Sequence, residues 1–333
     1  MSSRRLRAVG CALVLALAAV AVGWPAPASA AGLKVNDPMF NRQWGLRRIG
    51  APEAWKTTQG QGTIIAIVDT GVNSRHEDLG ANFLKSKQYD AINDDFDATD
   101  LQGHGTSVAG VAAAVTNNRK GIAGAAPKAK IMAIRASSAI TGFREADVAD
   151  GIMWAADNGA NVINLSLGGG GLVVGGVVIE PGEIEFATLY ATARGALVVA
   201  AAGNGGADKQ GDPICSFPAA SPAVLCVGAS DELDRLADFS NYFLRLDVVA
   251  PGTGILSTEE KFGYYATYRG TSVAAPFVAG VGALLMSMGA SNIQAAQIIR
   301  ASAKDLGLPG YDNTYGFGRL DAKAAVEMCK QFC

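Results

Sequence analysis

The segment TIIAIVDTG, residues 63 to 71, is a short apolar run that ends in a carboxylate and a glycine. A run of β-branched and other apolar residues of this length, bounded by a turn residue, predicts a buried strand. Asp69 stands at its end, where a carboxylate gains nothing from packing and needs hydrogen-bond partners. The segment therefore predicts a strand over Thr63 to Val68 that presents an acidic side chain at its carboxyl end.

Strand-like and helix-like runs then alternate along the chain. We expect further strands at Ile131–Arg135, Val162–Leu167 and Leu197–Ala202, and helices at Thr106–Val115, Ala146–Asn158 and Glu183–Arg194. Continuous apolar strands that alternate with helices are typical of a parallel sheet covered on both faces. The sequence thus predicts a doubly wound, three-layer αβα domain with a mainly parallel central sheet. In such sheets the ligand crevice lies at the carboxyl ends of the strands.

The composition is that of a folded chain. Of the 333 residues, 49% are hydrophobic and 17% are charged, far from the composition that keeps chains disordered. The length could hold two domains, but one large α/β domain also reaches this size, and the 41 glycines indicate many tight loops. A net charge of -2 gives no reason to expect nucleic acid or an anionic membrane as a partner. We expect a monomer without stable membrane association.

The first 30 residues have the pattern of a secretory signal peptide. Arginines at 4, 5 and 7 precede an apolar run from Ala8 to Gly23, and small residues lead up to a cleavage site after Ala30. The alternative, a membrane anchor, is disfavoured because the run is short and rich in alanine. Removal of the leader takes the net charge from -2 to -5. We expect export to the periplasm or the medium, and the sequence does not decide between the two.

Four cysteines remain after Cys11 leaves with the leader. An even number of cysteines in an exported protein indicates disulfides. The spacing favours Cys215 with Cys226 and Cys329 with Cys333, although four cysteines allow three pairings and free buried thiols stay an alternative.

Three motifs place an acid, a base and a hydroxyl at strand ends or helix starts. They are IVDTG at 67–71, GHGTS at 103–107 and GTSVAAP at 270–276. Glycines beside His104 allow a close approach of backbone and substrate, and Ser272 begins an apolar helical stretch where backbone N–H groups could face an oxyanion. Each motif alone also has a structural explanation, as a strand end, a structural histidine or a helix cap.

In chain order, Asp69, His104 and Ser272 match subtilisin, and the chain resembles the subtilisin-like serine peptidases, closest to the thermitase branch. The resemblance covers nearly the whole mature chain. It includes NDP at 36–38, QWGL at 43–46, APEAW at 51–55, VAAAVTNNRKGIAG at 111–124, and YGFGRLDA at 315–322. The fourth of these is nearly the calcium-loop sequence of thermitase.

The resemblance implies a serine endopeptidase that acts through an acyl-enzyme intermediate. Ser272 would attack the peptide carbonyl, His104 would move the proton, and Asp69 would hold the imidazolium. Asn204 and the Ser272 N–H would form the oxyanion hole.

The resemblance also implies an extended peptide or protein substrate held between two edges. The substrate-binding residues it assigns are Ser166, Leu167, Gly168, Gly169, Ala201, Ala202, Gly203, Gly142, Phe143 and Arg144. The small residues among them leave room for a large apolar P1 side chain, with broad specificity and open preferences beyond P1.

The resemblance further implies that the protein binds a structural Ca²⁺ and uses no catalytic cofactor. Side chains of Asp37, Asp78 and Asn118 and carbonyls of Val115, Lys120 and Ile122 would bind it. The alternative is a capping aspartate and a solvated loop. For the acidic stretch from Asn93 to Asp100 we favour an exposed charge run over a second ion site.

Only Ala31 to Val35 separate the predicted cleavage site from the similarity to the family. We therefore expect residues 31–333 to form the peptidase domain without a recognisable pro-segment, and how such a chain folds and stays controlled is open. Two rival functions remain, a catalytically silent peptide-binding protein of the same fold and an acid-active sedolisin-type peptidase. His104 and Asn204 speak against the second, which uses a Glu base and an Asp in the oxyanion site. The natural substrate is not indicated.

Overall fold

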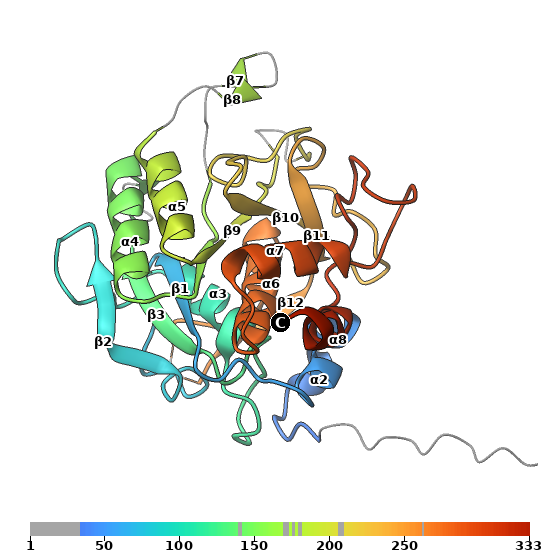
Figure 1. Cartoon of the computed structure of the whole chain (residues 1–333). Coiled ribbons are helices and arrows are strands. Elements are labelled where there is room, and N and C mark those ends of the chain that lie inside the picture. Colours follow the sequence, from blue (N-terminus) through green and yellow to red (C-terminus); the bar gives the residue numbers. More distant parts are fainter. Residues whose placement is uncertain are drawn as a thin grey trace, which may run out of the picture. The chain divides into compact units, whose positions relative to one another are not determined.

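Seven parallel strands form the central sheet of the protein (Figure 1). The computed structural model describes residues 34–138, 142–168, 173–174, 177–178, 182–205, 210–261 and 263–333. The strand order is β11–β10–β9–β6–β1–β3–β2, and every neighbouring pair is parallel. The strands are β1 (Ile64–Asp69), β2 (Phe83–Asp90), β3 (Lys130–Arg135), β6 (Val162–Leu165), β9 (Leu197–Ala201), β10 (Val224–Ser230) and β11 (Leu246–Pro251).

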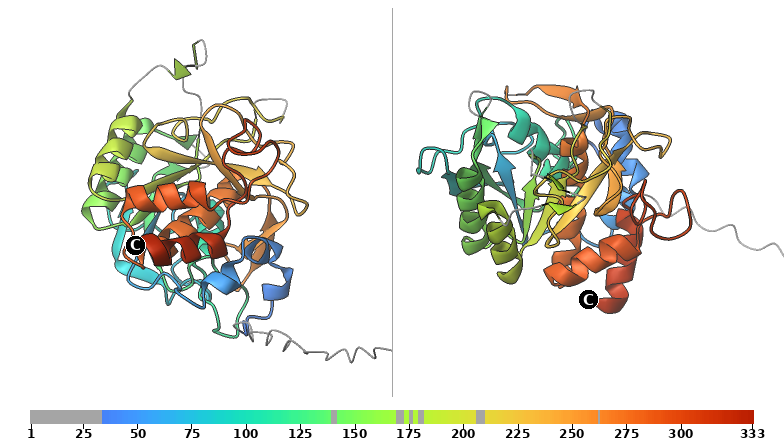
Figure 2. Two further views of the ribbon diagram at one scale, coloured as in Figure 1. Left: turned by 45° about the vertical axis from the view of Figure 1, so that its right-hand side comes forward. Right: turned by 90° about the horizontal axis from the view of Figure 1, so that it is seen from above.

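Helices cover both faces of this sheet. One face packs against α4 (Glu145–Asp157) and α5 (Glu183–Ala193), and the other against α3 (His104–Ala113) and α6 (Thr271–Met286). The view from above in Figure 2 shows the sheet between the two pairs. The predicted doubly wound, three-layer architecture is therefore confirmed. The remaining helices are η1 (Phe40–Arg42), α1 (Trp44–Arg48), α2 (Ala51–Ala54), α7 (Asn292–Ala301) and α8 (Ala322–Phe332).

The alternation of side chains along β1 shows why the apolar runs are continuous. Ile65 and Ile67 belong to the core on the α3 and α6 side, whereas Ala66 and Val68 belong to the core on the α4 and α5 side. Successive side chains of a strand point to opposite faces, so a strand buried on both faces needs apolar residues at every position. Each fully buried valine or isoleucine contributes about 1.5–3 kcal/mol of transfer free energy.

The predicted strands and helices are all present, with ends shifted by one or two residues. Three two-stranded antiparallel sheets were not predicted from the sequence. They are β4 (Ser137–Ser138) with β5 (Gly142–Phe143), β7 (Val173–Val174) with β8 (Val177–Val178), and β12 (Ile255–Thr258) with β13 (Tyr265–Tyr268).

Strand β1 lies between β3 and β6, and from this point the chain adds strands in both directions. Such a reversal of strand order opens a crevice at the carboxyl ends of the strands. The last residue of β1 is Asp69, so the predicted acid lies at the crevice.

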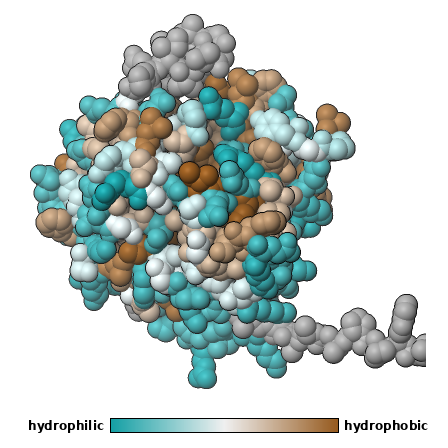
Figure 3. All heavy atoms as spheres, viewed as in Figure 1, coloured by the Kyte–Doolittle hydropathy of each residue, from teal (hydrophilic) through white to brown (hydrophobic). Residues whose placement is uncertain are grey.

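The described residues, 34 to 333 with the gaps given above, belong to one folded unit. No helix in this part of the chain is long and apolar enough to cross a membrane. Hydrophilic and hydrophobic residues are interspersed on the face seen in Figure 3. The predicted leader, residues 1–30, lies outside the described residues.

Candidate active site

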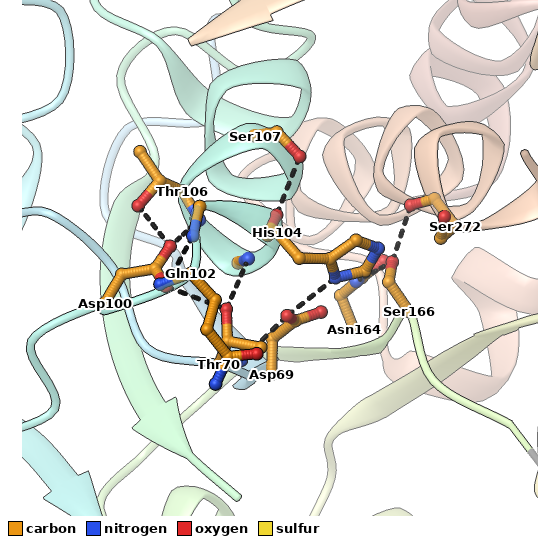
Figure 4. Close-up of polar contacts among 12 residues, drawn as sticks. Asp69, Thr70, Asp100, Gln102, His104, Thr106, Ser107, Asn164, Ser166 and Ser272 are labelled. Carbon is orange, nitrogen blue, oxygen red and sulfur yellow. Dashed lines mark hydrogen bonds and ion pairs between the residues drawn. The ribbon is translucent and has the colours of Figure 1, made fainter. Parts of the chain in front are cut away.

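Asp69 and His104 meet at the carboxyl end of β1 (Figure 4). Asp69 is 1% exposed, and His104 is the first residue of α3. Nδ1 of His104 lies 2.7 Å from Oδ1 of Asp69, which also accepts the N–H of Thr70 at 2.7 Å. The negative charge of Asp69 raises the pKa of His104 above its ordinary value, and burial opposes this rise only in part. The pair is therefore arranged to stabilise an imidazolium.

Gly105 permits this close approach of α3 to β1. A Cβ atom at position 105 would lie 2.1 Å from the carbonyl oxygen of Gly71 and 3.1 Å from Cβ of Asp69. Real Cβ atoms do not come so close to backbone oxygen, so no side chain fits here. The second glycine of GHG is thus explained by backbone contact.

A second buried carboxylate, Asp100, holds the start of α3. Its Oδ1 accepts the hydroxyl of Thr70 and the N–H groups of Gln102 and Gly103, each at 2.9 Å. Its Oδ2 accepts the N–H of Thr106 at 2.9 Å and the Thr106 hydroxyl at 2.6 Å. A carboxylate at a helix N-terminus satisfies N–H groups that have no partner within the helix and favours the helix dipole.

Asp100 corrects part of the sequence interpretation. Asp94, Asp95 and Asp97 are exposed, as an exposed charge run requires, but Asp100 is only 6% exposed. Through Thr70, whose hydroxyl also accepts the N–H of Gly105 at 2.9 Å, it connects the residue after Asp69 to the residue after His104. The last residue of the acidic stretch is therefore part of the support of the site.

Ser272 and Asn204 approach the crevice from the opposite side. Ser272 is the second residue of α6, and Asn204 follows β9. Oδ1 of Asn204 accepts the N–H of Thr271 at 2.8 Å, which leaves its Nδ2 without a partner among the described residues. A Cβ atom built on Gly270 would lie 3.1 Å from Oγ of Ser272 and 3.5 Å from Nδ2 of Asn204. The hydroxyl and the amide donor thus flank one point.

The His104 ring lies between Asp69 and Ser272 in Figure 4. Within the described part of the chain no hydrogen bond joins the ring to the Ser272 hydroxyl, although both groups line one cleft. Nucleophile–base contacts are often looser in the absence of substrate.

Pro276 gives the start of α6 an unusual connection. Proline has no N–H, so the carbonyl of Ser272, four residues earlier, has no partner within the helix. The hydroxyl of Ser166 donates to this carbonyl at 2.7 Å, and Ser166 in turn accepts the side-chain N–H of Asn164 at 2.8 Å. The end of β6 is thereby tied to the residue that bears the nucleophilic hydroxyl.

The cleft has a volume of about 700 Å³. Most of the predicted substrate-binding residues line it, namely Ser166, Leu167, Gly168, Ala201, Gly203, Gly142 and Phe143. Gly142 and Phe143 form β5, so one cleft edge is the small β4–β5 sheet.

Three predicted substrate-binding residues are not among the lining residues. Arg144 pairs with Asp147 at 2.7 Å and 2.5 Å, and this ion pair directs the guanidinium to α4. Ala202 is fully buried in the core on the α4 and α5 side. Gly169 lies outside the described residues.

The predicted calcium loop folds over Asp37 and Asp78. Asp37 accepts the N–H of Asn117 at 2.8 Å and of Asn118 at 3.1 Å, while Asp78 accepts the Asn118 amide at 2.7 Å and the N–H of Ile122 at 2.8 Å. Burial raises the pKa of Asp37, and the nearby Asp78 charge raises it further. Two acidic side chains therefore meet at Asn118.

The carbonyl oxygens assigned to this loop fit a cation. Those of Val115, Lys120 and Ile122 accept no hydrogen bond from the described part of the chain. The Lys120 ammonium lies 3.8 Å from Glu77, where it is neutralised by a carboxylate. No group of three or more His, Cys, Asp or Glu side chains is arranged to hold a metal ion among the described residues, so an ion here would also need amide and carbonyl oxygens. Oxygen ligands of this kind suit Ca²⁺.

Both favoured disulfides are present. Cys215 is bonded to Cys226, and Cys329 to Cys333. The first joins the segment before Ser216 to β10, and the second closes the end of α8.

The sequence interpretation missed several residues that support the site. They are Thr70, Asp100, Thr106 and Asn164. Thr70 follows Asp69 and Thr106 lies two residues after His104, so their places in the motifs could have indicated a supporting role. Asn164 offered another, because it is an amide within an otherwise apolar strand and is fully buried.

Comparison with known proteins finds one matching family over most of the chain. The sequence model of the subtilase family matches residues 60–318. A "thermophilic serine proteinase" from Bacillus sp. strain AK1 is 43% identical over 87% of this chain and 69% of its own length. Thermitase from Thermoactinomyces vulgaris is 43% identical over 88% of this chain and 99% of its own length. Among solved structures, a protease from Pseudoalteromonas arctica PAMC 21717 is similar with a TM-score of 0.77 and 33% identity, over 89% of this chain and 99% of that one.

Proposed function

Because the chain belongs to the subtilase family and is a serine endopeptidase near thermitase, we propose that Asp69, His104 and Ser272 are its catalytic triad. The observation that carries the proposal is the 2.7 Å contact of His104 with buried Asp69 in a cleft that the Ser272 hydroxyl also lines. The order and roles are those known for subtilisin.

In the acylation step, the Ser272 hydroxyl attacks the carbonyl carbon of the peptide bond. His104 takes the hydroxyl proton at Nε2 and then donates it to the leaving amine. Asp69 holds the other ring nitrogen, so the ring keeps one orientation and its positive charge is balanced. Water then attacks the acyl-enzyme by the same proton transfers in reverse.

The oxyanion of the tetrahedral intermediate is held by Nδ2 of Asn204 and the N–H of Ser272. Asn204 is fixed by the two bonds that its Oδ1 accepts from Thr271, at 2.8 Å to the N–H and 3.1 Å to the hydroxyl. A donor fixed before the reaction stabilises charge in the transition state without reorganisation.

Protein substrates lie extended between Ser166–Gly168 and Gly142–Phe143. Both segments line the cleft and offer backbone groups to which a peptide can pair irrespective of most side chains. Small residues at 201, 203 and 216 leave room for a large apolar P1 side chain. Specificity is otherwise broad.

A structural Ca²⁺ is bound by Asp37, Asp78 and Asn118 with the carbonyls of Val115, Lys120 and Ile122. The fit rests on the two buried carboxylates and on three carbonyls that accept no hydrogen bond from the described residues. The ion would neutralise the carboxylates and join the segment after Val35 to the loop that follows α3. It takes no part in the chemistry.

The enzyme is a monomer exported by the signal peptide of residues 1–30, and residues 31–333 form the peptidase domain. The two disulfides support an oxidising destination, because such bonds persist outside the cytosol.

The test is cleavage of a denatured protein at neutral to alkaline pH with calcium. We expect activity in the mature wild type, and loss of it both in Ser272→Ala and after treatment with a serine-directed inhibitor. Ser230→Ala is a matched control, since the buried Ser230 hydroxyl has no hydrogen-bond partner among the described residues. A folded wild type that neither cleaves nor reacts with the inhibitor would favour the silent peptide-binding alternative.

A further inference from the structure

The substrate cleft contains a carboxylate that the catalytic mechanism does not use. Of the described residues that line the cleft, Asp69, His104 and Asp212 carry ionisable side chains. Asp69 is engaged with His104, but the Asp212 carboxylate makes no hydrogen bond or ion pair with the described residues. Asp212 therefore brings to the cleft a negative charge that has no cationic partner among the described residues.

The S1 pocket, which receives the P1 side chain, closes on Ser216. A Cβ atom at Gly168 would lie 3.5 Å from Cβ of Ser216, and one at Gly203 would lie 2.4 Å from its hydroxyl oxygen. These two glycines come from the two predicted pocket walls, so Ser216 lies where the walls meet.

Asn241 places Asp212 beside this closed end. The buried Asn241 amide donates to the Ser216 hydroxyl at 3.2 Å, and its oxygen accepts the N–H of Asp212 at 3.0 Å and of Gly205 at 2.7 Å. One side chain thus holds Ser216, Asp212 and the residue after Asn204 in a fixed arrangement. Asp212 is partly exposed, and its exposed surface contributes to the cleft.

The backbone of Asp212 is thus held beside the closed end, and its residue lines the same cleft. A pocket with small neutral walls and an acidic residue at this place matches a long side chain with an apolar stem and a cationic tip. Arginine fits best, since its guanidinium can make two parallel hydrogen bonds to one carboxylate while its methylene groups contact the walls. An uncharged side chain of equal shape would leave the carboxylate partly desolvated and without a partner.

The geometry points to Asp212 as a specificity-determining residue that gives the S1 pocket a preference for arginine, and for basic P1 residues generally. This inference rests on the proposed peptidase function. It adds the basic side chains to the large apolar P1 side chains that the pocket walls predict.

The experiment compares peptide substrates that differ only in arginine or citrulline at P1. Citrulline has nearly the shape of arginine and no charge. We expect kcat/KM in the wild type to be about two- to fivefold higher for arginine, the range expected for a partly exposed ion pair, and this ratio to fall as salt is added. The ratio should approach one in Asp212→Asn and stay above that value in Asp212→Glu. Each ratio compares two substrates of the same enzyme variant, so a general loss of activity in that variant does not change it.

Asp150→Asn is the matched charge control. Asp150 is an exposed carboxylate on α4 and does not line the cleft, so its removal should leave the ratio as in wild type. A wild-type ratio of one, or a ratio that Asp212→Asn does not change, overturns the inference while leaving the peptidase function intact. If Asp212→Asn does not fold, the wild-type ratio and its salt dependence decide. If the folded enzyme cleaves none of these peptides and also fails to cleave a P1 phenylalanine peptide, both proposals are overturned.

Discussion

Replacing Asp100 by asparagine tests whether the carboxylate beneath α3 supports the active site. The substitution keeps the shape of the side chain but turns one acceptor oxygen into an N–H donor. Asp100 accepts five hydrogen bonds, three at Oδ1 and two at Oδ2, from backbone N–H groups and threonine hydroxyls. Whichever oxygen is replaced, at least one buried N–H then faces another donor.

The expected cost follows from these contacts. A buried N–H without an acceptor costs about 1–3 kcal/mol, and the bonds that remain lose the extra strength of a charged acceptor. Together we expect about 2–4 kcal/mol of lost unfolding free energy. For a chain of this size that lowers Tm by roughly 3–6 °C.

The assay is thermal unfolding followed by circular dichroism, in a Ser272→Ala background that prevents self-digestion. Asp97→Asn is the control, because Asp97 belongs to the same acidic stretch and is exposed, and its carboxylate bonds only to Thr99 among the described residues. It should change the unfolding free energy by no more than about 0.5 kcal/mol. If Asp100→Asn lowers Tm no more than this control, the structural role given to Asp100 is wrong.

Three further outcomes are expected. The raised pKa of His104 means that the catalytic base gains its proton at a higher pH than usual, so the acid limb of kcat/KM should have its midpoint above about 6.5; a midpoint at or below that value contradicts the Asp69–His104 pairing. Gly105→Ala should lower kcat by about a hundredfold, because its Cβ atom would displace the residue beside His104, whereas Gly182→Ala, which meets only the flexible end of Glu145, should retain activity. Removal of Ca²⁺ by a chelator should lower the unfolding free energy of the Ser272→Ala protein, and with it Tm. The loss is about 2.7 kcal/mol if the ion had been at a hundred times its Kd, and Asp37→Asn should abolish this calcium response.

The sequence predicted the centre of the fold because its strands are buried on both faces. In β9 every residue is apolar, and in β1 every residue before the final Asp69 is apolar, so a simple apolar run identifies both strands. β10 was missed because it contains Gly228 and ends in Ser230, and its place in the sheet depends on parallel neighbours far along the chain.

Sequence motifs indicated some of the candidate site residues. Residues that reach the site only through spatial contacts could not be found in this way. Ser272 and His104 stand in recognisable motifs. Asp100 and Asp212 stand in polar loops with nothing local to distinguish them from solvated carboxylates. Their roles depend on contacts with distant side chains, which are the Thr70 hydroxyl for Asp100 and the Asn241 amide oxygen for Asp212. For Arg144 the sequence did not indicate the ion pair with Asp147 on α4, and its substrate-binding role stays a prediction.

The connection from Pro276 through Ser272 to Ser166 constrains how this enzyme could be redesigned. The wall of S1 at Ser166 donates a hydrogen bond to the residue that carries the nucleophile, so enlarging or replacing that side chain leaves a carbonyl without its donor and disturbs the nucleophile's own backbone. The opposite end of the pocket, at Ser216 and Asp212, has no such bond to α6 among the described residues. A programme to alter specificity should therefore vary positions 212 and 216 first, and leave 166 unchanged.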